Sequence, residues 1–209
     1  ALSNGEYLLT HLRMTGHFHH VKENNNADKN KAQRFQVAKF YLNDNSYLTH
    51  NSIRKFGGIK LLTDLELKQA FSKLGPEPFL IDADEFYSNI SNHANANIKT
   101  KIMDQSFIVG VGNIYAQEAL YHAGINPQNK IGQVPKEKVL KLHQELLKVL
   151  TLAIKNNGST VDNYTSLTGK GSFQDMLTVY GRNNCPKGHD LSEVKLGGRG
   201  TNYCPVCQN

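Results

Sequence analysis

The 209-residue sequence contains no tryptophan, only three cysteines and no long hydrophobic run. An odd number of cysteines, all within the last 25 residues, argues against the disulfide framework of a small secreted domain. No segment reaches the ~20 apolar residues of a membrane-spanning helix. The first residues also lack the basic start and apolar centre of a signal peptide. We therefore expect a cytoplasmic protein whose thiols are free or bind a metal.

What the sequence has in excess is positive charge. Lysine and arginine number 24 against 18 acidic residues, which gives a net charge of +6 and a pI of about 9.1. A basic protein suits a polyanionic partner such as nucleic acid, because phosphate contacts release bound cations. The same charge is also compatible with a merely basic soluble protein.

The first third of the chain has the pattern of strands and turns. Segments 6–14, 35–43 and 46–50 are predicted strands, and "NDNS" at 43–46 is typical of a hairpin turn. Residues 21–33 are polar without periodicity and predict a loop. The proline- and glycine-containing stretch 74–84 predicts a linker.

From Asp84 onwards the hydrophobic pattern becomes helical. Candidate boundaries are an Asp cap before the first helix, Asn113 as the cap of the next helix and Gly124 as its end. A long helix is predicted between Pro135 and Gly158. Its predicted buried stripe consists of Val139, Leu142, Leu146, Val149 and Ile154. In the segment before Asn113, Ile98, Ile102 and Ile108 are expected near one face.

The cysteines and one histidine have the spacing of a metal site. Cys204 and Cys207 form a C-x2-C pair, while Cys185 and His189 lie upstream as C-x3-H. Three thiolates and an imidazole suit tetrahedral Zn²⁺, and a short tail without a core can draw folding energy from a metal. The alternative is free thiols and an exposed histidine.

Two glycine-rich turns indicate contact with an anion. "VKLGGRGTNY" predicts a hairpin that presents Arg199 to a phosphate or base. "GVGN" predicts a tight turn between two helices, where free amides at the start of the second helix face an anion. A turn with an incidental arginine and a corner that only packs are the respective alternatives. Neither "GVGNIY" nor "TGKGS" fits a nucleotide-binding fingerprint.

These segments together resemble a known family. "HLRMTG", "IRKFG", "LGPEPF", "IKTKIMDQSFIVGVGNIYAQEALYHAGINP", "FQDMLTVYGR" and "GGRGTNYCPVCQ" occur in order. They resemble bacterial formamidopyrimidine-DNA glycosylase, a base-excision repair enzyme. The resemblance implies an α+β protein in three parts. These are a partial N-terminal β-sandwich with its linker (1–82), a helix-two-turn-helix domain with a lesion-covering loop (83–178) and a C-terminal zinc-finger β-hairpin (179–209).

The resemblance also implies roles for individual residues. Met14, Arg54 and Phe56 match residues that fill the gap left by a flipped-out nucleotide, since an apolar wedge and a ring can replace lost stacking. Core packing for Met14 and Phe56, and a surface ion pair for Arg54, are the alternatives. His11 is expected to be structural.

Three further positions are implied to hold phosphates. Lys99 and Asn113 match phosphate-holding positions, although lysines near helix starts are common. Arg199 matches the zinc-finger arginine that grips phosphate beside the lesion, and a catalytic part in the second elimination step is also implied for it. Residues 165–174 correspond to the loop that closes over the flipped purine.

Three departures from the family pattern stand out. The Pro-Glu pair that starts the family's enzymes, with its nucleophilic amine, has no match, and Ala1 is not a substitute. We therefore expect the 209 residues alone to lack glycosylase activity and their first half to fold poorly; borohydride trapping on an 8-oxoguanine duplex tests the former. Gly188 occupies the usual second-cysteine position, with His189 one residue later. Arg34 stands in the region of paired family histidines.

The expected function is thus bifunctional excision of oxidised purines through a Schiff base and β,δ-elimination. The expected partner is double-stranded DNA containing oxidised purines or abasic sites, bound by a monomer with one structural Zn²⁺. The alternative is a non-catalytic, zinc-dependent module that binds damaged DNA. A generic zinc-ribbon interaction protein is a third interpretation, and it leaves "GVGNIY" and "RKFG" unexplained.

Overall fold

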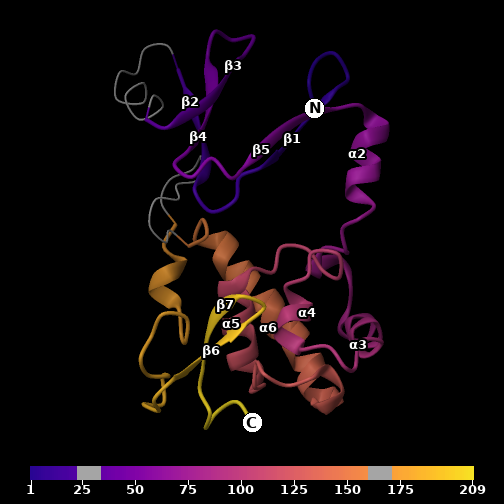
Figure 1. The fold of residues 1–209 in the computed structure, drawn as a ribbon, viewed down its shortest axis with the longest axis vertical. Helices are drawn as coiled ribbons and strands as arrows, with labels where there is room; N and C mark the ends of the chain where they lie inside the picture. Colours follow the sequence, from indigo (N-terminus) through magenta and orange to yellow (C-terminus); the bar gives the residue numbers. More distant parts are fainter. Residues whose placement is uncertain (23–33, 160–170) are drawn as a thin grey trace. The chain divides into compact units, whose positions relative to one another are not determined.

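The computed structural model describes residues 1–22, 34–159 and 171–209. The chain divides into two compact units (Figure 1). Unit 1 comprises residues 1–71 and 156–174, and unit 2 comprises residues 72–155 and 175–209. Most of the predicted 21–33 loop lies outside the described residues. The boundaries after residues 82 and 178 stay predictions.

Unit 1 is built from two small antiparallel sheets. One pairs β1 with β5, and the other has the order β2-β4-β3. The strands are β1 (Tyr7–His11), β2 (Gly16–Val21), β3 (Gln36–Tyr41), β4 (Tyr47–Ser52) and β5 (Gly58–Leu62). The three predicted strand segments are confirmed, whereas β2 and β5 had not been singled out.

The predicted hairpin turn at 43–46 is confirmed between β3 and β4. Asp44 accepts hydrogen bonds from the amide and the hydroxyl of Ser46. Asn45 has a φ of 64°, a left-handed conformation that asparagine tolerates better than most residues. The turn chemistry read from the sequence therefore fixes this part of the register.

Helix α2 (Asp64–Phe71) follows the last strand of unit 1 and was missed by the sequence analysis. Its start is a capping box. The amide and hydroxyl of Thr63 donate to the Glu66 carboxylate at 2.8 Å, and the amide of Glu66 donates back to the Thr63 hydroxyl at 3.3 Å. The "TDLE" spacing was the available signal.

Unit 2 is helical and ends in a β-hairpin. Its hairpin pairs β6 (Ser192–Leu196) with β7 (Arg199–Tyr203), which confirms the predicted "VKLGGRGTNY" hairpin. The helices are α3 (Ala83–Ser91), α4 (Ile98–Ile102), α5 (Asn113–Ala123) and α6 (Lys136–Lys155), with short 3-10 turns at η1 (Pro78–Leu80), η2 (Ile131–Gln133) and η3 (Phe173–Met176), the last crossing the boundary between the units. Among the described residues, no helix combines the length and apolarity needed to cross a membrane.

Helix α6 packs against α3 and α5 and forms the centre of the unit 2 core. Four of the five predicted stripe residues are buried, but Ile154 is 68% exposed. The prediction was wrong there because a 3.6-residue period carries the buried face from Val149 to Ala153, not to Ile154. Ile98, Ile102 and Ile108 are all fully buried, as expected.

Two of the predicted helix signals are confirmed and one is wrong. Asp82 caps α3 by accepting from the Glu85 amide at 2.8 Å, and Gly124 ends α5 in a left-handed conformation. Asn113, however, is the first residue inside α5, and Gly112 is its N-cap without any side-chain cap. The Asn113 side chain is instead used in tertiary contacts described below.

Candidate nucleic-acid interface and metal centre

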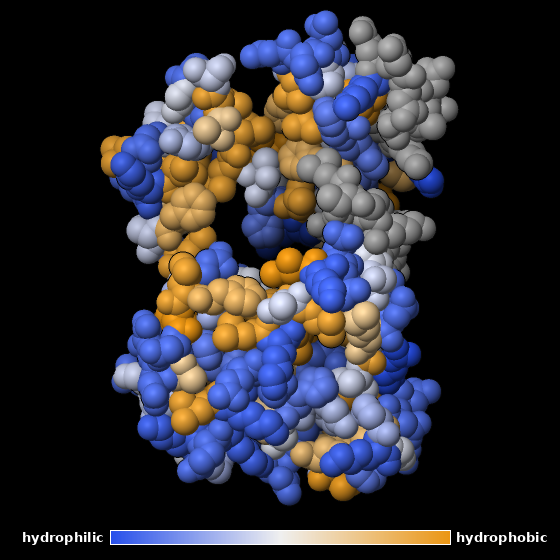
Figure 2. All heavy atoms as spheres, turned by 180° about the vertical axis from the view of Figure 1, so that it is seen from behind, coloured by the Kyte–Doolittle hydropathy of each residue, from blue (hydrophilic) through white to orange (hydrophobic). Residues whose placement is uncertain are grey.

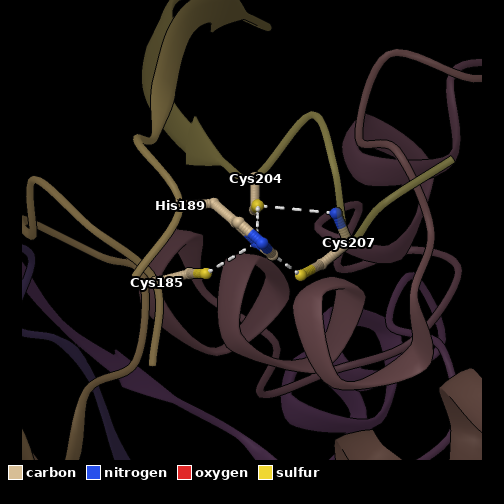
Figure 3. A group of neighbouring side chains, drawn as sticks. All are labelled: Cys185, His189, Cys204 and Cys207. Carbon is tan, nitrogen blue, oxygen red and sulfur yellow. Dashed lines mark hydrogen bonds between the residues drawn. The ribbon is translucent and has the colours of Figure 1, made fainter. Parts of the chain in front are cut away.

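Four potential metal ligands converge beneath the terminal hairpin (Figure 3). Their ligand atoms lie within 4.8 Å of one another. The imidazole Nδ1 of His189 is 3.5 Å from Cys185 Sγ, 3.7 Å from Cys204 Sγ and 3.4 Å from Cys207 Sγ. A tetrahedral ion with metal–sulfur bonds of ~2.3 Å and a metal–nitrogen bond of ~2.0 Å would separate sulfur from nitrogen by about 3.6 Å. The donor set and its spacing therefore fit a tetrahedral metal ion.

The C-x3-H turn depends on a glycine. Gly188 has a φ of +82°, and its amide donates to the Cys185 carbonyl at 2.8 Å while the Cys185 amide donates to the His189 carbonyl at 2.9 Å. A side chain at position 188 would be strained in this conformation. The extra residue is thus absorbed in the turn, and the longer imidazole reaches back to the sulfurs.

The three thiols influence one another electrostatically. Burial raises the pKa of the Cys185 thiol, but hydrogen bonds from the backbone of His189 and Lys187 outweigh it and lower that pKa to about 6. Burial and the neighbouring Cys204 raise the pKa of Cys207. Thiolates this close repel one another unless a cation lies between them.

The hairpin is docked on helices α4 and α5 through a buried lysine. The Lys99 ammonium donates to Asn113 Oδ1 and to Thr201 Oγ1, both at 2.6 Å. Lys99 and Thr201 are both fully buried. Burial, and secondarily the charge of Arg199, lowers the pKa of Lys99 to about 8. Of the residues expected to hold phosphates, Lys99 is therefore covered by protein, and its ammonium lies directly behind Asn113.

Gln117 adds a second set of contacts at the same junction. Its Oε1 accepts from the Asn202 amide at 2.7 Å, and its Nε2 donates to the Gly200 carbonyl at 3.3 Å. Asn113 Nδ2 donates to the same carbonyl at 3.3 Å. Sequence reasoning missed Gln117, although its position one turn after Asn113 places it on the same face of α5.

Arg199 projects from this docked hairpin. It is the first residue after the two-glycine turn, pairs with Leu196 across the strands and is exposed. Gly197 and Gly198 both have positive φ values, as a two-residue hairpin turn of this kind requires. The structure thus brings Lys99, Asn113 and Arg199 to one junction, where Lys99 is buried, Asn113 is half-buried and Arg199 is exposed.

The glycine turn before α5 presents bare backbone. Gly110 has a φ of +80°, and a Cβ added at either Gly110 or Gly112 would meet no atom within 4 Å. No side chain caps the start of α5. The first-turn amides and the positive end of the helix dipole therefore face an uncrowded surface beside Asn113.

Sequence reasoning also missed a second junction on α5, in which a buried carboxylate binds backbone amides. Glu118, on α5 and 2% exposed, accepts hydrogen bonds from the amides of Thr178, Val179 and Tyr180 at 2.7–3.0 Å. These contacts fix the "TVYGR" segment, which leads to the metal site, against the same helix. A glutamate amid the apolar face of a helix was the signal.

Unit 1 brings together the three residues predicted to fill a gap in a base stack. Met14 and Phe56 are 68% and 72% exposed, so core packing does not account for them. Arg54 Nη1 lies 3.6 Å from Met14 Sδ, and Arg54 makes no ion pair among the residues that the structure describes. An apolar wedge, a ring and a guanidinium therefore project from two neighbouring turns.

Those two turns are held together by hydroxyls and close backbone packing. Thr15 Oγ1 accepts from the Arg54 amide at 3.2 Å and lies 3.3 Å from Ser52 Oγ. A Cβ on Gly16 would come within 2.2 Å of the Leu12 carbonyl oxygen, and one on Gly57 within 2.6 Å of the His11 carbonyl oxygen. The exposed side chains thus stand on a closely packed base.

The structure also gives the local contacts of His11 and Arg34, two further residues singled out in the sequence. His11 Nδ1 accepts from the Arg13 amide at 3.2 Å, and both residues line a hollow of about 340 Å³ with Phe56 and Lys60. The structural role of His11 stays a prediction. The guanidinium of Arg34 lies over the Phe35 ring at 5.1 Å, and a DNA contact for it stays a prediction. The predicted lesion-covering loop lies outside the described residues up to residue 170.

Comparison with known proteins places this geometry in a family. Residues 74–165 match the formamidopyrimidine-DNA glycosylase H2TH domain. A formamidopyrimidine-DNA glycosylase of Exiguobacterium sibiricum is 36% identical over 212 residues, covering 97% of this chain and 74% of the relative. One from Lactobacillus helveticus is 36% identical over 214 residues, covering 99% and 76%.

Solved structures of two DNA complexes are similar to this chain. The Lactococcus lactis Fpg with DNA containing an abasic site has a TM-score of 0.85 and 29% identity, covering 98% of this chain and 75% of that chain. A mutant of the same protein with DNA containing Fapy-dG has the same TM-score, identity and coverage. The α+β architecture expected from the sequence is confirmed by these matches and by the cysteine-bearing hairpin. By its sequence and its fold, this chain belongs to the formamidopyrimidine-DNA glycosylase family.

Proposed function

We propose that this chain is the DNA-binding part of a base-excision repair glycosylase that removes oxidised purines. The lesions would be 8-oxoguanine and formamidopyrimidines, excised through a Schiff base and followed by β,δ-elimination. No residue of the 209 is assigned as the nucleophile. Arg199 is proposed for the second elimination step, since its exposed guanidinium can stabilise a developing phosphate charge.

The exposure of Met14 and Phe56 beside Arg54 is the observation that carries this proposal. Large apolar side chains on turns cost solvation energy unless a partner covers them. A duplex with an extruded nucleotide offers that partner, because the wedge and the ring replace the lost stacking and the guanidinium can bond the orphaned base.

The phosphate contacts are proposed for unit 2. Asn113 would donate to a phosphate together with the first amides of α5, and Arg199 would pair with a phosphate from the hairpin. The buried Lys99 would add its charge from behind Asn113. A phosphate would in turn balance the two cationic groups, which stand close together without a carboxylate partner among the described residues.

A structural Zn²⁺ is proposed at Cys185, His189, Cys204 and Cys207. Bound there, the ion would supply folding energy to a hairpin that has little core of its own. The three thiolates would hold it with the Nδ1 atom of His189, and the ion would thereby fix the direction in which Arg199 projects.

Binding to duplexes that contain an abasic site tests the proposal. The purified protein is expected to bind abasic duplex at least tenfold more tightly than intact duplex at equal salt, because an abasic site is more easily extruded. Replacing both Met14 and Phe56 by alanine should remove the preference while leaving affinity for intact duplex nearly unchanged, since that affinity comes from phosphates.

Leu65→Ala is a matched control, because Leu65 is another exposed apolar side chain of unit 1 outside the two turns. Its preference for abasic duplex should equal that of the parent. Equal affinity of the parent protein for abasic and intact duplex would contradict the proposal and favour a general zinc-containing interaction domain.

A further inference from the structure

We propose that Gln105 is a positioning residue for DNA binding, which it would serve by fixing the glycine turn ahead of α5. The inference rests on the proposed function, because it concerns how the amides beside Asn113 are presented to phosphate. It adds a residue that has no charge of its own and whose exposed side chain is bonded to the backbone of the turn.

The side chain of Gln105 links the first two residues of the glycine turn to the end of α4. Its Oε1 accepts from the Gly110 amide at 3.0 Å, and its Nε2 donates to the Val111 carbonyl at 3.2 Å. Nε2 also donates to the Met103 carbonyl, at 3.1 Å, at the end of α4. The single side-chain amide of Gln105 thus bonds three backbone groups, one at the end of α4 and two in the glycine turn.

These bonds matter because the two glycines of the turn have no side chains that could hold it by packing. Gly110 has a left-handed conformation, and neither Gly110 nor Gly112 has a side chain that could pack. Glycine-rich backbone loses more conformational entropy on ordering than any other sequence. A turn left loose would have to be ordered by its ligand, which weakens binding.

The main chain of the same segment is braced from the other side by the "LGPEP" stretch. The Gly75 amide donates to the Gln105 carbonyl at 2.9 Å, and the Val109 amide donates to the Pro76 carbonyl at 3.1 Å. A Cβ on Gly75 would lie 2.4 Å from the backbone of Phe107. The predicted linker is therefore also a support for the turn, and Gln105 connects that support with Gly110.

Gln105→Met is the variant that tests the role. Methionine keeps the length and neutrality of glutamine but forms none of the three hydrogen bonds. Gln144→Met is the control, since it makes the same chemical change on the exposed face of α6. Affinity for abasic and for intact duplex would be measured over a range of salt concentrations, together with hydrogen exchange of the Gly110 amide.

Gln105→Met should weaken both affinities by roughly tenfold, as expected for the loss of preorganisation by hydrogen bonds, and should speed exchange at Gly110. The slope of log affinity against log salt should stay unchanged because no cation is lost, whereas Arg199→Gln should reduce it by about 0.9. Gln144→Met should match the parent in every respect.

Affinity of Gln105→Met within twofold of the parent would overturn the inference, as would an equal loss in Gln144→Met. If the parent itself fails to prefer abasic duplex, the proposed function fails instead. Fast exchange at Gly110 in Gln105→Met with unchanged phosphate-dependent binding would show that the glutamine shapes the turn but not DNA affinity, which also overturns the inference.

Discussion

The two units of this protein bury different kinds of side chain. Among the described residues of unit 1, only Val21 and Phe173 belong to the fully buried apolar set, while β4 buries Thr49, His50 and Asn51. The apolar side chains of unit 1 are largely at the surface, as the orange areas in the upper part of Figure 2 show. Unit 2 instead has a continuous apolar core around α6.

This difference separates the main source of stability from the exposed apolar side chains. Burial of apolar area is the main source of folding free energy, so unit 2 should hold most of the stability. Unit 1 keeps Met14 and Phe56 in water, where they are available for a partner. The following predictions test this division, beginning with the largest expected effect.

Removing the metal should have the largest effect, and it should be confined to unit 2. Chelation of the bound ion, or Cys204→Ser, is expected to release the hairpin at a cost of several kcal/mol, because a structural zinc site contributes folding energy directly. Hydrogen exchange of β6 and β7 should rise towards that of an unfolded chain, while β2 and β4 exchange as before. Restoring Zn²⁺ to the chelated protein should reverse the change.

Equal truncations in the two units should differ in their cost to the free energy of unfolding by more than ~1.5 kcal/mol. Leu142→Ala removes a fully buried side chain of α6 and should lower the free energy of unfolding by about 2–5 kcal/mol. Leu61→Ala removes a side chain that is more than half exposed and should cost less than ~0.5 kcal/mol. Urea unfolding, followed through NMR amide signals of each unit, measures both losses of unfolding free energy. Similar losses for the two variants would contradict the idea that unit 2 holds most of the stability.

Gly75→Ala should destabilise unit 2 by about 1–3 kcal/mol. The added methyl would meet the Phe107 backbone, which cannot move aside as a flexible side chain could. Gly58→Ala in unit 1 places the methyl in open space and should be neutral or stabilise by up to ~1 kcal/mol. Thermal unfolding of the two variants should therefore shift in opposite directions or differ clearly in size.

Acid should weaken unit 1 through His50. Burial, and secondarily the nearby His17, lowers the pKa of His50 below 6.5, and neither of its ring nitrogens has a hydrogen-bond partner among the described residues. The unfolded state therefore binds the proton first, so stability is present above pH 6.5 and is lost as the pH falls towards the folded-state pKa. Exchange of the β4 amides at pH 7.5 and 5.5 measures this, and His50→Leu should show a smaller pH effect.

Alkali should have a smaller effect on unit 2 through Lys99, and the pH dependence should have the same sign as that of unit 1. Burial lowers the pKa of Lys99 from its usual 10.5 to about 8 in the folded state. The unfolded state therefore binds more protons between these values, and stability should rise across that range. DNA affinity should fall over the same range as the charge is lost. Lys99→Met should remove both trends in chemical unfolding and binding titrations, and a parent protein without them would contradict the assignment.

Local signals in the sequence were sufficient to predict several features of unit 2. The cysteine and histidine spacing, the two-glycine hairpin and the Asp82 cap are each set within a few residues, so sequence reasoning found them. The capping box of α2 was equally local and was simply overlooked. Ile154 was misplaced because a stripe drawn over five turns tolerates an error in period that a buried face does not.

The cap of α5 and the burial of Lys99 could not be predicted from local sequence, because both depend on tertiary contacts. Asn113 has the residue type of an N-cap, but Lys99 and the Gly200 carbonyl compete for its amide group, and Gly112 takes the cap position. The burial of Lys99 depends on Thr201, which follows it by 102 positions. No periodicity within α4 indicates that a hairpin so far along the chain will cover this lysine.

The bare glycine turn has a consequence for selectivity. At Gly110 and Gly112 an approaching molecule meets only peptide groups and Cα hydrogens, and such a surface has the same chemistry for every nucleotide step. Tracking along a duplex would then be equally easy at all sequences. Discrimination between damaged and normal bases would then have to arise from other groups, namely the exposed thioether of Met14, ring of Phe56 and guanidinium of Arg54 in unit 1.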